Sequence, residues 1–199
     1  MKKLLITGFD PFGGECINPS WEAVKGLKDQ IGEFALTKLQ IPTVFGKAAQ
    51  AVLAAAEECC PDVILCIGQA GGRKGITPEV VGINLREAGI CDNEGNCPVN
   101  VPVVPEGPDA YFATLPVRVI LAALKEAQIP GSLSYSAGAF VCNDVLYTLL
   151  HRFHGTKTQV GFIHVPFLPQ QAKEGIPSMP LEQIIQALET AVLALDDES

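Results

Sequence analysis

The chain has 199 residues, of which 48% are hydrophobic and 18% are charged. This composition predicts one globular domain with a large core and excludes disorder of the whole chain. The formal net charge is −8, and no basic run exceeds Lys2-Lys3, which argues against nucleic acid and anionic membranes as partners. The first apolar run ends at Thr7, and no apolar stretch is long enough to cross a membrane, so neither export nor membrane insertion is expected.

The apolar and polar residues alternate in a way that predicts strands and helices in turn along the chain. The predicted strands are 4–7, 34–41, 62–68, 80–85, 132–136 and 158–165. The predicted helices are one that begins at Trp21 after a Ser20 cap, followed by 46–58, 117–128, 140–153 and 181–195. The run 62–68 is apolar throughout, which is typical of a parallel strand that is covered on both faces. We therefore predict a single-domain α/β/α sandwich over residues 1–199, with a mixed, mostly parallel twisted sheet.

Residues 86–115 form a polar, proline-rich stretch that is too long for a simple connection. Segments of this kind cover a site, join subunits or carry a hairpin of their own. The sequence leaves these three alternatives open.

The seven cysteines are odd in number, and a chain of this length does not need disulfides to support its core. We expect reduced thiols of a cytoplasmic protein, most of them packed as small buried hydrophobic residues. No C-x-x-C pair occurs, so the spacing of a zinc site is absent. Whether Cys16 or Cys91 links subunits is left open, as is the question of which cysteine could serve as a nucleophile.

Two candidate reactive side chains lie near the carboxyl ends of predicted strands, where sites form in open α/β sheets. Cys142 falls in the first turn of a predicted helix, whose N–H groups and dipole would lower the pKa of the thiol and stabilise an oxyanion. His164 ends an apolar strand before Pro166, where an imidazole can accept the proton of a thiol. The alternative for both is a buried packing residue.

Further candidates follow the first and third apolar strands. The turn 68–73 is rich in glycine but lacks the spacing of a phosphate-binding loop. Glu79 is either the carboxylate that orients an imidazole or an ordinary surface residue. Phe9 and Phe12 either hold a flat neutral ligand between their rings or pack into the core beneath the loop.

In combination these segments resemble the pyroglutamyl peptidase family, cysteine peptidases that are also called pyrrolidone carboxyl peptidases. The resemblance runs from Leu5 nearly to the end of the chain. The segments that carry it are 7–14 with 18–20, 68–73 with Glu79 and Asn84, 92–95, 136–143 and 164–166. It implies that Cys142 is the nucleophile, His164 the general base and acid, and Glu79 the residue that orients the imidazole. It also implies a cytoplasmic enzyme, frequently a homotetramer, that has no metal and no other cofactor and acts on peptides with an amino-terminal pyroglutamate.

The substrate that this resemblance implies is a neutral lactam, which needs apolar walls and a few amide partners. Phe9 and Phe12 would supply the walls, and Gln69 would position the substrate amide or help to hold the acyl oxygen. A site that hydrogen-bonds the lactam would reject proline, because its buried polar groups would lose their partners.

The chain departs from the family pattern at two places. Gly89 stands where the family motif A-R-I-P-D-N-E-G has arginine, and residues 80–84 lack the basic residue that usually follows the glutamate. Loss of one donor to a transition state costs about 10²-fold or more in turnover, so we expect lower activity or shifted specificity unless Arg86 supplies the missing charge.

Two rival functions remain. A nucleoside phosphorylase-like hydrolase would bind phosphate with Arg73 and Arg86 and stack a base on the aromatic side chains. A non-catalytic binding protein would keep the fold but lose activity through the change at Gly89.

Overall fold

Six strands form the central sheet of the computed structural model, which describes residues 1–196, in the order β2-β3-β1-β4-β8-β5. The bounds of these strands are β1 Lys2–Phe9, β2 Gln30–Ile31, β3 Phe34–Ile41, β4 Val63–Gln69, β5 Thr77–Pro78 and β8 Gln159–Val165. The inner strands pair in parallel, whereas β2 and β5 at the two edges run antiparallel to their neighbours. The prediction of a mixed, mostly parallel sheet is confirmed.

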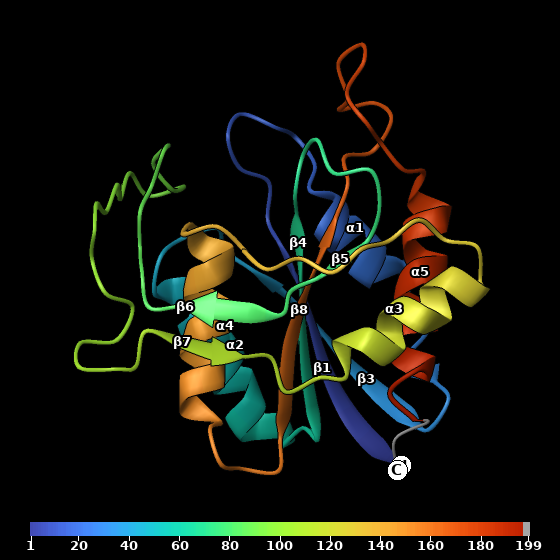
Figure 1. Ribbon diagram of the computed structural model, residues 1–199, viewed down its shortest axis with the longest axis horizontal. Coiled ribbons are helices and arrows are strands. Elements are labelled where there is room, and N and C mark those ends of the chain that lie inside the picture. The colour runs from blue at the N-terminus through green and yellow to red at the C-terminus, as the bar shows by residue number, and fades with distance from the viewer. Residues whose placement is uncertain (197–199) are drawn as a thin grey trace.

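Helices cover both faces of this sheet, as the prediction of an α/β/α sandwich requires (Figure 1). Their bounds are α1 Pro19–Gly26, α2 Lys47–Cys59, α3 Val117–Glu126, α4 Val141–Arg152 and α5 Leu181–Leu193. In Figure 1, α2 and α4 lie on one side, and α1, α3 and α5 lie on the other. Ile64 and Cys66 of β4 pack toward α2 and α4, and Leu65 and Ile67 pack toward α1, α3 and α5, because side chains alternate along a strand.

The predicted strand 80–85 belongs to a second, smaller sheet. Within it β6 (Val81–Ile83) pairs antiparallel with β7 (Ala110–Phe112), and this pair packs against α4. Residues 84–109 form the long excursion between the two strands, seen at the left of Figure 1. Of the three alternatives for the stretch 86–115, the structure shows that it contributes one strand of a β-ribbon.

Two local predictions are wrong. Residues 132–136 form no strand, and only single-residue bridges join Gly131 to Ile76 and Ser134 to Glu79. The neighbouring strand β5 spans two residues and therefore offers too few consecutive partners for a ladder. The cap of α1 is Asn18 rather than Ser20, because Asn18 Oδ1 accepts the N–H of Ser20.

The expectation that most of the seven cysteines are buried is also wrong, whereas the expectation of reduced thiols fails only for one pair. Cys66 is the buried one; Cys59 and Cys142 are partly buried, Cys16 and Cys60 are exposed, and Cys91 and Cys97 form a disulfide. The Cα atoms of the bonded pair lie 4.6 Å apart, within the usual range for a disulfide, because the intervening loop turns back on itself. Cys91 is thereby bonded within the chain rather than to another subunit.

No helix within residues 1–196 combines the length and the apolar character needed to cross a membrane.

Candidate active site

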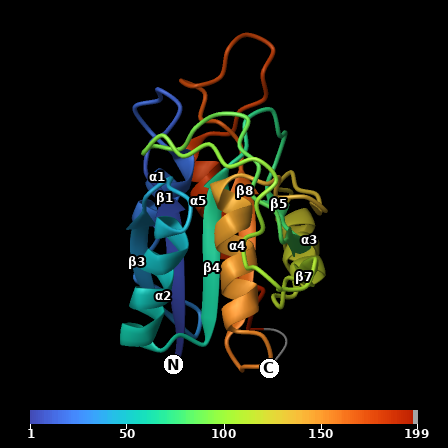
Figure 2. The ribbon, with the colours of Figure 1, turned by 90° about the vertical axis from the view of Figure 1, so that its left-hand side faces the viewer.

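The candidate site lies at the end of the sheet where the loops after β1, β4 and β8 gather. These strands pair in parallel, so their carboxyl ends meet at the same edge. Figure 1 shows the three loops together above the sheet, and Figure 2 shows the same arrangement from the side of α4. The amino-terminal end of α4 points to this edge and brings Cys142 with it.

Cys142 is the second residue of α4 and so lies in the first turn of the helix, as predicted, and its thiol lies over a glycine of β4. A Cβ atom on Gly68 would come within 3.0 Å of Cys142 Sγ and within 2.7 Å of the Phe162 ring. A side chain at this position would therefore displace the thiol. Gly68 is also the parallel register partner of His164 in β8. The thiol and the imidazole thus lie over neighbouring strands, on the face of the sheet that α4 covers.

His164 and Glu79 form a buried hydrogen-bonded pair. His164 Nδ1 lies 2.7 Å from Glu79 Oε1, and the two residues are 3% and 0% exposed. The backbone N–H of Glu79 donates to the carbonyl of Phe162, which ties the glutamate to β8. An ionised carboxylate accepts a hydrogen bond from the N–H at Nδ1, so the neutral imidazole presents Nε2 as the base. Burial excludes the alternative that Glu79 is an ordinary surface carboxylate.

Arg73 is a further member of this cluster, although the sequence suggested no catalytic role for it. Its Nη1 donates to Glu79 Oε1 at 2.7 Å and to the hydroxyl of Thr77, and its Nη2 donates to the carbonyl of Ser136 at 3.3 Å. Arg73 and His164 therefore share one carboxylate oxygen. The sequence feature that could have indicated this role is an arginine at the end of a glycine-rich turn, shortly before the candidate catalytic glutamate.

Burial is the largest single influence on the pKa values of the three site residues His164, Glu79 and Cys142. It lowers the pKa of His164, although the hydrogen bond and charge of Glu79 oppose this shift. Burial alone would raise the pKa of Glu79, but hydrogen bonds with His164 and Arg73 help to bring it below its ordinary value. Burial, with a smaller contribution from the charge of Glu79, raises the pKa of Cys142 to about 12. The predicted lowering of this pKa by the helix N-terminus is therefore wrong, and the resting cysteine is a neutral thiol.

The two aromatic residues of the first loop occupy different environments. Phe9 is 2% exposed and belongs to the core, with its ring centroid 6.3 Å from that of Phe162. Phe12 is partly exposed, and its centroid lies 6.1 Å from that of Phe140, the N-cap residue of α4. Phe45 meets Phe140 edge-on at 5.2 Å. Of the two alternatives, packing into the core thus describes Phe9, and Phe12 joins an aromatic cluster at the start of α4, the helix that carries Cys142.

Gln69 is the last residue of β4, and a second glutamine holds its side chain. Gln171 Nε2 donates to Gln69 Oε1 at 3.1 Å, and Gln171 Oε1 accepts the N–H of Leu168 at 3.1 Å. Sequence reasoning missed Gln171 because the contact joins loops that follow different strands, and no local pattern indicates it.

Gly89 is exposed, and no heavy atom lies within 4 Å of a Cβ built on it. Arg86 does not supply the charge of the missing arginine. Its Nε lies 2.6 Å from Oδ1 of the buried Asp144 on α4, which makes it part of a structural ion pair. This pair and the Arg73–Glu79 pair also occupy the two arginines that the phosphate-binding alternative required.

Comparison with known proteins agrees with this geometry. The family model described as pyroglutamyl peptidase matches residues 2–198. Pyrrolidone-carboxylate peptidases of Bacillus cereus strain 03BB102 and of Bacillus anthracis are each 53% identical over 197 residues, covering 96% of this chain and 92% of the relative.

Solved structures show the same likeness. Pyroglutamyl peptidase I from Bacillus amyloliquefaciens superimposes with a TM-score of 0.95 at 46% identity, over 99% of this chain and 98% of the other. Pyrrolidone carboxyl peptidase from Thermococcus litoralis gives 0.94 at 38% identity, over 99% and 94%. The chain therefore belongs to the pyroglutamyl peptidase family of cysteine-type peptidases.

Proposed function

We propose that the chain removes an amino-terminal pyroglutamyl residue from peptides through a thioester on Cys142, with His164 as general base and acid and Glu79 orienting the imidazole. Family membership supports the reaction and the substrate class. The assignment of these roles rests on the buried hydrogen bond between His164 and Glu79 and on the position of the Cys142 thiol over Gly68. Neither the phosphorylase nor the binding-protein alternative is favoured.

The first step transfers the thiol proton to His164 Nε2 as the sulfur attacks the pyroglutamyl carbonyl carbon. The pKa of Cys142 is raised and that of His164 is lowered, so a standing thiolate–imidazolium pair is disfavoured and proton transfer accompanies attack. The imidazolium then donates its proton to the leaving amine. A water molecule that is deprotonated by the same imidazole hydrolyses the thioester.

The first turn of α4 offers the developing oxyanion its N–H groups. The first four N–H groups of a helix have no partner within the helix, and they carry the positive end of its dipole. The N-cap Phe140 has no side-chain hydrogen bond to this turn. Donors fixed before the reaction stabilise charge that appears in the transition state.

For the substrate pocket, we propose that Phe12 forms an apolar wall and that Phe9 supports the site from beneath through its contact with Phe162. Gln69, held by Gln171, positions the lactam amide or the acyl oxygen. A neutral ring between aromatic and amide groups needs no carboxylate of the kind that binds a charged amino terminus. Loss of the lactam carbonyl, as in proline, leaves these amide groups without partners.

We further propose that residues 1–199 act as one catalytic domain and that the enzyme is a cytoplasmic homotetramer. Support comes from the family resemblance and, for assembly, from large apolar side chains that are exposed in the single chain, among them Phe112 and Tyr135. Light scattering coupled to gel filtration tests the tetramer.

Release of a fluorescent amine from a pyroglutamyl conjugate in reducing buffer tests the proposed function. The matched controls are a prolyl conjugate and the Cys142→Ser variant. We expect release by the wild type from the pyroglutamyl conjugate alone. Equal release by Cys142→Ser would remove Cys142 as the nucleophile, and no release by folded wild-type protein would favour the binding-protein alternative.

A further inference from the structure

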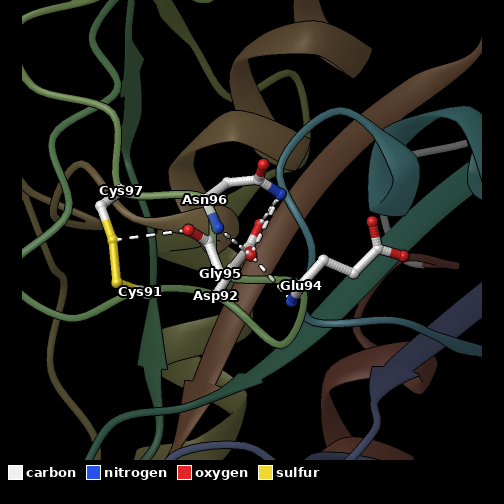
Figure 3. Close-up of a disulfide and its surroundings, with 6 residues drawn as sticks. All are labelled: Cys91, Asp92, Glu94, Gly95, Asn96 and Cys97. Atoms are coloured by element: carbon white, nitrogen blue, oxygen red, sulfur yellow. Dashed lines mark hydrogen bonds between the residues drawn. A yellow bond between two sulfur atoms is a disulfide. The ribbon is translucent and has the colours of Figure 1, made fainter.

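The disulfide between Cys91 and Cys97 closes a short exposed loop that is organised around Asp92 (Figure 3). Asp92 Oδ1 accepts the N–H groups of Glu94 and Asn96, each at 2.9 Å, and Oδ2 accepts the N–H of Phe45 at 2.9 Å. These bonds do not depend on the disulfide. We therefore expect the loop to keep its place when the sulfur–sulfur bond is broken, but with more freedom at its two ends.

The loop is tied to the segment that carries Phe12. Asn93 Nδ2 donates to the carbonyl of Pro11 at 2.9 Å and to Asp10 Oδ1 at 3.2 Å, and Asn93 N donates to the carbonyl of Thr43 at 3.1 Å. A change in the freedom of the loop therefore reaches the backbone next to Phe12 through hydrogen bonds.

A second connection runs toward α4. Glu94 pairs with Lys47 at 2.6 Å, at the start of α2, and Phe45, which is bonded to Asp92, packs on Phe140. The loop thus holds two sides of the aromatic cluster of Phe12, Phe45 and Phe140, in which Phe12 is the proposed wall of the lactam pocket. It makes no hydrogen bond to the catalytic residues Cys142 and His164 in the described structure.

We propose that Cys91 and Cys97 form a thiol–disulfide exchange site for low-molecular-weight thiols, and that its redox state sets the affinity of the enzyme for its substrate. This proposal rests on the proposed function. In the oxidising direction, one thiolate of the pair attacks a small disulfide such as oxidised glutathione and releases one small thiol. The second cysteine then displaces the other small thiol and closes the bond. Two protein thiols are oxidised as one small disulfide is reduced, and two molecules of small thiol reverse the reaction.

Exposure directs this chemistry to Cys91 and Cys97 rather than to the nucleophile. Both are exposed, whereas Cys142 is partly buried, and its raised pKa of about 12 keeps it as the less reactive thiol. Cys142 reacts when substrate and His164 are in place, so mild oxidants reach the loop before they reach Cys142.

The closed form is the one that favours binding. The hydrogen bonds to Pro11 and Phe45 are present in both forms. With the disulfide intact the ends of the loop are held as well, so Pro11 and Phe45 have less freedom and less ordering is required when the substrate enters. We expect reduction to raise the dissociation constant about three- to tenfold, since a few loop residues regain freedom. The rate of the chemical step should not change, because the catalytic groups are held by other contacts.

The experiment uses the Cys142→Ser background, in which bound substrate is not turned over. The dissociation constant of a pyroglutamyl peptide is measured by calorimetry after treatment with oxidised glutathione and after reduction with a phosphine, while mass spectrometry records the state of the pair. The matched control carries Cys91→Ser and Cys97→Ser in the same background. We expect tighter binding in the oxidised protein and no redox effect in the control.

Equal affinity in the two redox states would overturn the proposal, as would an equal shift in the control. If the wild type still hydrolyses the pyroglutamyl conjugate in reducing buffer, the proposed function stands and the redox inference alone fails. An absence of binding in both states, together with an absence of hydrolysis, would overturn both.

Discussion

The two faces of the central sheet are packed by different kinds of side chain. Toward α1, α3 and α5, β4 and β8 present aliphatic residues such as Leu65 and Val165, within a core cluster that is hydrophobic throughout. Toward α2 and α4 the same strands present Cys66 and Phe162, and at their carboxyl ends Gly68 and His164. Because side chains alternate along a strand, neighbouring residues serve stability on one face and chemistry on the other.

The difference between the two faces is tested most strongly by Cys142 and Cys66, which both lie on the face toward α2 and α4. Cys142→Ala should reduce kcat/KM by at least about 10⁴-fold, because the nucleophile and base act as a unit. Cys66→Ala, on the same face but deeper in the core, should keep most of the activity and lose about 1 kcal/mol of unfolding free energy. Hydrolysis of the pyroglutamyl conjugate and urea unfolding measure the two effects. Activity that survives in Cys142→Ala would show that the chemistry lies elsewhere.

The charges around His164 predict opposite pH shifts for two variants. kcat/KM should rise with pH as the imidazole becomes neutral, and the acid limb should lie below the ordinary pKa of about 6.5, because burial lowers the pKa of His164. Glu79 raises this pKa and Arg73 lowers it. Glu79→Gln should therefore move the acid limb to lower pH, and Arg73→Met should move it to higher pH.

The same two variants should also differ in the size of the loss. Glu79→Gln should lower kcat about 10²- to 10⁴-fold, and Arg73→Met about tenfold, with KM little changed. Arg73→Lys should restore part of the rate, since a cation is again available to Glu79. A profile of kcat/KM measured between pH 4 and 9 covers the acid limb. If the acid limb moves in the same direction in Glu79→Gln and Arg73→Met, Arg73 is not a positioning residue.

Gly68→Ala probes the space in which the thiol lies. Its Cβ would meet the Phe162 ring at 2.7 Å and Cys142 Sγ at 3.0 Å, so we expect a loss of about 1–3 kcal/mol in unfolding free energy and about a tenfold loss in kcat. Gly89→Ala is the matched control, because a Cβ there meets no atom within 4 Å. Equal kinetics of the two variants would mean that the thiol does not depend on Gly68.

The aliphatic face should show the smallest effect on activity. Leu65→Ala removes a fully buried side chain and should cost about 2–5 kcal/mol of unfolding free energy. At 25 °C we expect kcat/KM to stay within about twofold of the wild type, since the variant stays folded and the site is on the other face. Urea unfolding and the hydrolysis assay measure the two quantities. A large loss of kcat in folded Leu65→Ala would contradict the division between the faces.

The sequence patterns that were read correctly are those carried by nearby residues. The apolar run of β4 and the helical spacing of α4 both depend on local periodicity, and both elements lie where they were expected. The segment 132–136 forms no strand because its one bridge, from Ser134, goes to Glu79 beside a strand of two residues far away in the chain. A single sequence does not display the length of a distant partner.

By itself the sequence determined the five helices and the four long strands β1, β3, β4 and β8 of the central sheet. It also determined the placement of Cys142 in a first helical turn and of His164 at a strand end, and the family. These features follow from apolar periodicity and from motifs of adjacent residues. The tertiary structure alone decided which residues share the site and in what state. Burial made Cys142 a neutral thiol, long-range contacts joined Arg73 to Glu79, and loop geometry closed the bond at Cys91. Desolvation and contacts between distant segments exist only once the chain is packed, so no local pattern contains them.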